Sequence, residues 1–238
     1  IEDFLLSKNS LFFSSIIAFN ELSIPEIINN SVLPDTVSGI LNFTFTQNHN
    51  KNNIIGNINL NSISNKNFYI GESSAEFNFN YINNSHILGN INGSFVNIRN
   101  DYNNFDELYY SLNTYQDSII IDSISAFNSD GDSIKIKEFI YQPNSNISLR
   151  DFQSSLKGAH IHFNNMSLLK KDDFYYLEET PISFDNGIIS ISGKYAPKGD
   201  YDLWCDMNNI ELIKINQLFN INHRLTGNST GTLHISNS

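Results

Sequence analysis

Apolar and polar residues alternate one by one along most of this chain. In 187–195, for example, Ile189 and Ile191 fall on one side, while Ser190 and Ser192 fall on the other. A period of two is typical of β-strands with one apolar and one polar face. The same pattern recurs in the ranges 40–46, 54–61, 75–81, 118–127, 133–141 and 158–163. It predicts about a dozen or more strands in one antiparallel meander.

The signals that connect or interrupt these strands are few. The segment from Asn128 to Asp132, Asn-Ser-Asp-Gly-Asp, predicts the turn of a hairpin between 118–127 and 133–141. Ser23-Ile-Pro-Glu26 has the form of a capping box and could begin a short helix through residue 28. The range 149–156 is a weaker helix candidate, and an irregular crossover is the alternative at both places. The sequence therefore predicts an all-β fold with one or two short helices.

A wide sheet with one apolar face must keep that face from water. It can pack as a sandwich, close into a barrel, or hold something else that is apolar. A dozen strands at about 4.8 Å each would give an open trough of about 60 Å. Acyl chains are one material that could fill such a trough.

An internal repeat suggests how the sheet grows. Residues 11–46 and 201–236 each contain an alternating strand, a Leu/Ile-rich step, a polar stretch and a second strand after a glycine. The step is Leu22-Ser-Ile-Pro-Glu-Ile27 in the first copy and Ile213-Lys-Ile-Asn-Gln-Leu218 in the second. Repeats of all-β units indicate a structure that lengthens by adding strands.

This unit resembles the AsmA/TamB superfamily of bacterial envelope proteins. The likeness lies in the repeated unit and in Asn186-Gly-Ile-Ile-Ser-Ile-Ser-Gly193, followed by a strand that opens at Asp202-Leu203. It is a pattern of glycines and alternation without a catalytic signature. The resemblance implies a long, twisted, mostly antiparallel sheet curled into an open U-shaped groove, with residues 1–238 as one elongated segment of a longer protein.

The resemblance also implies a function and a location. It implies a non-enzymatic segment in the periplasm that carries phospholipid acyl chains between the inner and outer membranes, and it is compatible with support of outer-membrane assembly. Contact with both membranes, including the anchor in the inner membrane, would come through flanking segments outside this chain. An outer-membrane β-barrel is a further partner that the family allows.

The candidate groove lining consists of apolar residues from the alternating strands. These residues are Leu41, Phe43, Ile58, Leu60, Phe77, Phe79, Ile121, Ile136, Ile161, Ile189, Ile191, Leu233 and Ile235. The same residues could instead form an ordinary closed core, and a strand bulge would locally exchange the two faces.

Charge and composition exclude several classes of partner. The net charge is −11, which disfavours nucleic acid and a polybasic attachment to anionic lipid. The one cysteine, Cys205, cannot form an internal disulfide. No apolar run approaches the roughly 20 residues of a membrane-spanning helix.

Candidate reactive groups are sparse. His160 and His162 share a strand face and could bind a metal with a third ligand, although exposed strand histidines explain them better. The 128–132 segment resembles part of a calcium loop but has no terminal Glu, so a plain turn is the better interpretation. We find no phosphate loop, dinucleotide fingerprint or Gly-x-Ser-x-Gly motif, and we expect neither an enzyme nor a cofactor.

Two other classes of protein compete with the groove. A secreted or surface β-solenoid of adhesin type would have short fixed repeats of about 20 residues and stacked Asn ladders, whereas the spacing here is irregular. A lipocalin-type barrel would have about eight strands, fewer than the pattern predicts.

Overall fold

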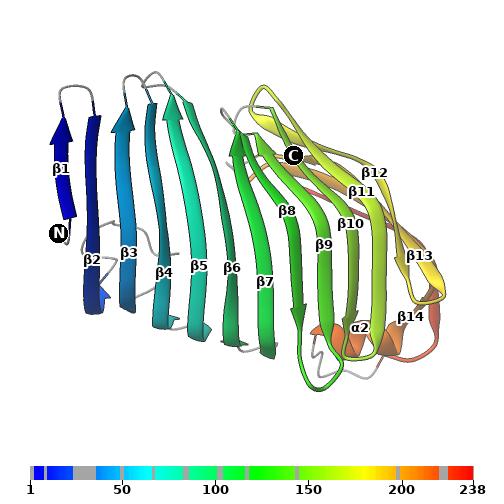
Figure 1. Cartoon of the computed structure of the whole chain (residues 1–238). Helices are drawn as coiled ribbons and strands as arrows, with labels where there is room; N and C mark the ends of the chain where they lie inside the picture. Colours follow the sequence, from blue (N-terminus) through cyan, green and yellow to red (C-terminus); the bar gives the residue numbers. More distant parts are fainter. Residues whose placement is uncertain are drawn as a thin grey trace. The chain divides into compact units, whose positions relative to one another are not determined.

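The chain forms β-strands from end to end of the part that the structure describes. This computed structural model describes residues 3–7, 10–23, 36–48, 51–65, 68–82, 86–100, 104–115, 118–142, 145–196, 199–219 and 225–237. Every strand is hydrogen-bonded to its neighbours in sequence, so the order in the sheet is β1 to β15 without a crossover (Figure 1). The described strand pairs are antiparallel, and the sheet does not close into a barrel. This confirms the predicted all-β class.

The chain divides into two compact units, residues 1–122 and 123–238. The strands that lie within the first unit are β1 (Asp3–Ser7), β2 (Ser10–Ser23), β3 (Thr36–Asn48), β4 (Lys51–Asn65), β5 (Phe68–Ile82), β6 (His86–Asn100) and β7 (Asn104–Tyr115). Strand β8 (Ser118–Phe127) contains the boundary between the units.

The second unit holds the remaining strands and the one helix of the described residues. Its elements are β9 (Ser133–Gln142), β10 (Asn146–Leu156), β11 (Ala159–Lys171), β12 (Phe174–Phe184), β13 (Gly187–Tyr195), β14 (Tyr201–Glu211), α2 (Leu212–Phe219) and β15 (Asn228–Ser236). The predicted hairpin turn is confirmed, because the backbone N–H of Asn128 donates to Asp132 O at 3.0 Å and Asn128 Oδ1 accepts from Asp132 N at 2.8 Å.

The two helices predicted from the sequence are not found among the described residues. The predicted helix at 149–156 is wrong, because these residues belong to strand β10. The predicted helix after Ser23 falls on residues 24–28, which lie outside the described part of the chain. Helix α2 was not predicted, although it occupies the Leu/Ile-rich step of the second repeat.

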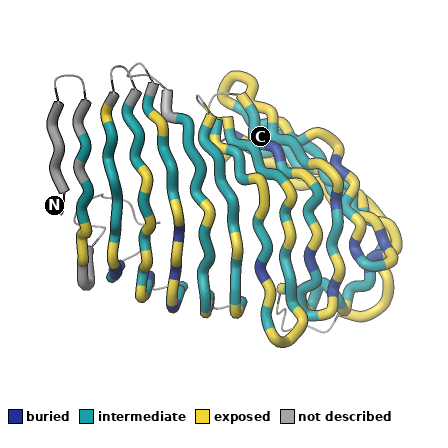
Figure 2. Tube along the Cα trace, viewed as in Figure 1, coloured by how far each residue is buried: buried dark blue, intermediate teal, exposed yellow. Residues whose placement is uncertain are grey.

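Few side chains are fully buried. Figure 2 shows partly buried and exposed residues along nearly every strand, with buried ones at isolated points. The exception is the place where α2 lies against the sheet of the second unit. There Ala159, Phe184 and Ile210 are buried, and Ile215 and Leu218 of the helix pack against them.

Helix α2 therefore covers the apolar face at the ends of several strands. Ala159 begins β11, Phe184 ends β12 and Ile210 lies near the end of β14. The Nζ of Lys214 also donates a hydrogen bond to the carbonyl of Gly158 in the β10–β11 turn. One edge of this apolar face is thus covered by the chain itself.

Replacing Ile210 should test this small core. Ile210 is fully buried, at 0% exposure, so Ile210→Ala should lower the free energy of unfolding by about 2–5 kcal/mol through lost contacts and a cavity. The neighbouring Ile213→Ala is a matched control, because that side chain is 48% exposed and should cost well under 1 kcal/mol. Urea unfolding followed by circular dichroism measures both; equal losses would contradict the packing described.

Candidate functional site: an apolar sheet face

The first unit carries one continuous face of apolar side chains. Cross-strand partners in an antiparallel sheet lie on the same face, so the register defines rows that cross the strands. One row consists of Ile17, Leu41, Ile58, Ala75, Gly93 and Tyr110. The next consists of Ser15, Phe43, Gly56, Phe77, Ile91 and Leu112.

Large rings lie over glycines of neighbouring strands within this face. A Cβ added at Gly56 would come within 2.6 Å of Phe77 Cζ, and one added at Gly93 within 2.6 Å of Tyr110 Oη. Phe79 covers Gly89 in the same way. Aromatic side chains thus occupy the space that the glycines leave, which keeps the face filled. Burial in this setting raises the pKa of Tyr110 above its ordinary value.

β-Bulges keep the apolar residues on that face along the full strand length. Gly39 pairs with Leu60, whereas Val37 pairs with Ile63, so β4 contains one extra residue between these pairs and Ile63 joins Leu60 on the apolar face. In the second unit, Met207 pairs with Gly231 and Ile210 with Ser229, so β14 contains one extra residue near Asn209, which has a φ of 56°. One extra residue in one strand of such a pair restores the apolar face.

The second unit has an apolar face built in the same way. Ile191, Cys205 and Leu233 form one cross-strand row, and Leu203 and Ile235 lie beside it. Another row joins Ile136, Phe152 and Phe163, with the rings of Phe152 and Phe163 stacked at 4.8 Å.

The register brings together the predicted lining residues within each unit. In the first unit, Leu41, Phe43, Ile58, Leu60, Phe77 and Phe79 share one face and are partly buried. In the second unit, Ile136, Ile161, Ile189, Ile191, Leu233 and Ile235 share one face. Ile121 lies in β8 and is also partly buried.

Their burial is less than that of a closed core. In the first unit, all six of these side chains are only partly buried, and in the second Leu233 and Ile235 on β15 remain 51% and 46% exposed. Of the large side chains described here, Ile210 alone is fully buried. Apart from the area under α2, the apolar faces are therefore still partly accessible.

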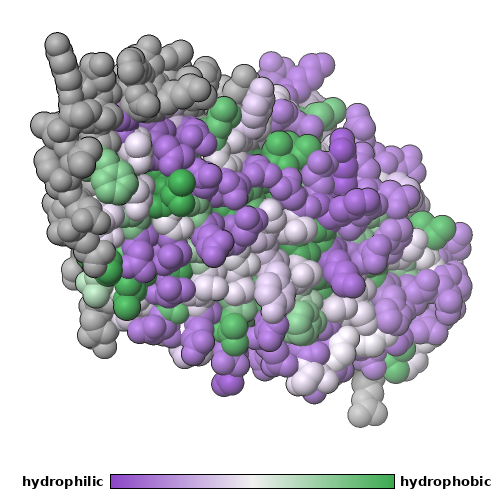
Figure 3. Space-filling model, in the orientation of Figure 1, coloured by the Kyte–Doolittle hydropathy of each residue, from purple (hydrophilic) through white to green (hydrophobic). Residues whose placement is uncertain are grey.

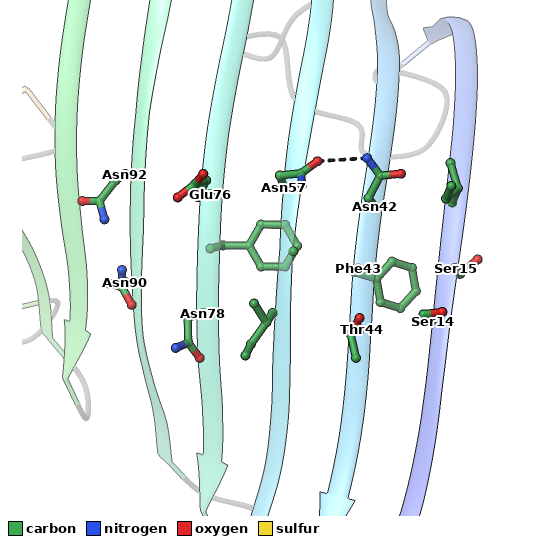
Figure 4. Close-up of a pocket in the computed structure, with 14 residues that line it drawn as sticks. Ser14, Ser15, Asn42, Phe43, Thr44, Asn57, Glu76, Asn78, Asn90 and Asn92 are labelled. Atoms are coloured by element: carbon green, nitrogen blue, oxygen red, sulfur yellow. Dashed lines mark hydrogen bonds between the residues drawn. The ribbon is translucent and has the colours of Figure 1, made fainter. Parts of the chain in front are cut away.

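The opposite face of the first unit is rich in amides. Asn42, Asn57, Glu76 and Asn92 form one cross-strand row, which can be followed in Figure 4. Asn42 Nδ2 donates to Asn57 Oδ1 at 2.9 Å, and Asn53 Nδ2 donates to Asn78 Oδ1 and Asn80 Oδ1 at 2.9 and 3.0 Å. Hydrophilic residues also predominate on the surface in view in Figure 3.

A hollow of about 710 Å³ lies on this amide-rich face. Its lining is mainly the polar-face side chains of β2 to β6, among them Thr44, Asn57, Glu76, Asn78 and Asn90 (Figure 4). The sequence pattern did not point to it, because a hollow depends on which residues of different strands lie opposite one another. Of the predicted lining residues of this unit, Phe43 and Phe77 also border the hollow, whereas Leu41, Ile58, Leu60 and Phe79 do not.

Reactive chemistry is scarce in the described residues. Burial, and to a lesser extent the neighbouring Asp206, raises the pKa of the Cys205 thiol, which disfavours the reactive thiolate. No three His, Cys, Asp or Glu side chains of the described residues are grouped so that they could hold a metal ion. His160 and His162 do lie on one strand face, as predicted. No helix in the described ranges is long and apolar enough to span a membrane.

Comparison with known proteins adds no identification. No family model matches this chain, and the searches of curated proteins and of solved structures found no match either. Function must therefore be inferred from the faces of the sheet and from the sequence pattern.

Adding a methyl group at Gly56 should test the packing of rings over glycines. The new Cβ would collide with Phe77 Cζ and with the backbone of Asn42 and Phe43, so Gly56→Ala should destabilise the first unit by about 1–3 kcal/mol. Asn59→Ala, at an exposed position of the same strand, is the control and should change stability by about 0.5 kcal/mol or less. Denaturant unfolding would contradict this packing if both variants were equally stable.

Proposed function

We propose that this chain binds acyl chains of phospholipids on the apolar faces of its sheet and carries them without catalysis. The observation that supports this most directly is the burial of the candidate residues. Large apolar side chains such as Phe43, Ile58 and Phe79 share a face of an unclosed sheet, yet they are only partly buried. An apolar ligand would complete their removal from water.

The chemistry of the face suits a long hydrocarbon chain. Each CH₂ that leaves water contributes about 0.8 kcal/mol, so a single acyl chain gains several kcal/mol without any hydrogen bond. Apolar contact has no preferred direction, which allows a bound chain to slide along the strands with small barriers. The bulges favour such binding, because they keep polar side chains from interrupting the apolar face.

The resemblance to the AsmA/TamB superfamily implies where in the cell this binding would take place. An AsmA/TamB-like segment would work in the periplasm, anchored to the inner membrane through a flanking segment, and would pass phospholipid toward the outer membrane. An outer-membrane β-barrel remains a proposed partner. The alternative of a β-solenoid interaction protein gains no support from the antiparallel, unclosed order of the strands.

A photo-crosslinking amino acid at position 79 tests lipid contact. We expect crosslinking at Phe79 in cells to yield a phospholipid adduct that mass spectrometry identifies. The matched control is the same amino acid at Glu76, an exposed position on the opposite face of strand β5. Equal lipid capture at both positions, or none at position 79, would contradict the proposal.

Replacing Phe79 by Asp separates an open apolar face from a closed core. If the face were a closed core, the carboxylate introduced by the substitution would be buried and unpaired, and the first unit would unfold. On a partly accessible face the carboxylate can reach water, so we expect Phe79→Asp to keep a cooperative melting transition while co-purified phospholipid falls at least about tenfold. Phe79→Leu should retain both. Loss of the melting transition in Phe79→Asp would favour a closed core.

A further inference from the structure

A second hollow, of about 540 Å³, adjoins the larger hollow on the amide-rich face of the first unit. Both are lined by Asn78, Asn90 and Asn92, so together they form one trough across the strands, here called the amide trough. It crosses from β2 to β7, a distance of about 24 Å at the ordinary spacing of strands. This length suits an extended ligand better than a single small molecule.

The amide trough is nearly free of charged groups. Its lining includes asparagines from four neighbouring strands, among them Asn57, Asn78, Asn90 and Asn113. Of the described residues that line it, Glu76 alone is charged, and none is a lysine, arginine or histidine. An anion would therefore meet no cation there. Each amide offers both donors and an acceptor, as a hydroxyl group also does, so the lining matches a neutral ligand rich in hydroxyls.

The hydrogen-bonding groups at the middle of the trough have no protein partner among the described residues. Towards one end, Asn42 Nδ2 donates to Asn57 Oδ1 at 2.9 Å. Glu76 and Asn92 lie directly opposite each other on β5 and β6, but no side-chain hydrogen bond joins them (Figure 4). Asn90, the next residue on the same face of β6, is also unpaired. Because Asn90 and Asn92 line both hollows, these unpaired groups lie where the hollows meet.

Exposed apolar side chains lie beside these amides on the same face. Ile55 stands between Thr44 and Asn78 in its cross-strand row and is 51% exposed. Tyr115 lines the smaller hollow and is 57% exposed. A ligand that fills the trough thus meets apolar surface as well as amides. It should itself have both kinds of surface, because an apolar group of the protein gains nothing from contact with hydroxyls.

We propose that the amide trough binds a neutral carbohydrate chain. A sugar ring has hydroxyls around its edge and C–H groups on its two faces. Asn90 and Asn92 form hydrogen bonds with the hydroxyls, while Ile55 and Tyr115 contact the C–H faces.

Other extended ligands match this surface less well. An acyl chain would cover the amides without offering them a hydrogen bond, which costs free energy. Nucleic acid is disfavoured by the net charge of −11 and by the lack of basic side chains among the described residues of the trough. The carbohydrate site lies on the polar face and does not depend on lipid binding by the apolar faces.

Isothermal titration calorimetry of the whole chain tests this site. The neutral probes are maltohexaose, cellohexaose, chitohexaose and mannohexaose, and hexagalacturonate is the charged probe. We expect saturable binding of at least one neutral hexasaccharide. Asn90→Ala and Asn92→Ala should each weaken it about fivefold, the factor expected from one neutral hydrogen bond. Ile55→Ser should also weaken it, because the contact with the sugar faces is lost.

Asn59→Ala is the matched control. Asn59 is an exposed asparagine on the same face of β4, but it lines neither hollow. Its variant should bind the probes as the unaltered chain does, and circular dichroism checks that every variant keeps its fold. Equal weakening in Asn59→Ala and Asn90→Ala would overturn the proposal, as would undiminished binding in Ile55→Ser. Saturable binding of hexagalacturonate alone, or of no probe, would overturn it too.

Discussion

The structure depends on keeping the apolar side chains of unusually long strands on one face. Strands β4, β5 and β6 each contain 15 residues, where five or six is the ordinary length. A one-residue slip anywhere along such a strand would turn the rest of its apolar set toward water. The bulges, such as the one in β4 between Leu60 and Ile63, place that slip where the sequence also changes its alternation. Bulge position and sequence pattern are therefore matched.

This arrangement shifts the source of stability away from a deep core. Contacts between adjacent strands must therefore contribute the folding stability that buried side chains contribute in a compact domain. Each cross-strand pair contributes about 0.2–1 kcal/mol, and the long strands provide many of them. The rings of Phe77 and Phe79 over glycines increase contact within the face without closing it. Helix α2 adds local burial around Ile210, where the chain covers its own apolar surface.

The sequence predicted where strands lie but not where bulges interrupt their alternation. The ranges 118–127 and 187–195 match β8 and β13, whereas 54–61 recovers only part of Lys51–Asn65, because a bulge ends the simple alternation. The range 149–156, predicted as a helix candidate, lies in β10, which pairs with β9 and β11 in one continuous register. The larger hollow of the first unit escaped prediction because its lining comes from five different strands, β2 to β6.

The polar and the apolar face of the sheet interact with water in different ways, and this difference decides where ligands are expected. Amides on the polar face of the first unit can satisfy one another, as Asn42 and Asn57 do, so much of that surface is complete without a ligand. On the apolar faces no pairing is possible, because only contact with other apolar groups removes them from water. Incomplete removal from water, rather than residue type alone, thus makes the apolar faces the expected place for an apolar ligand.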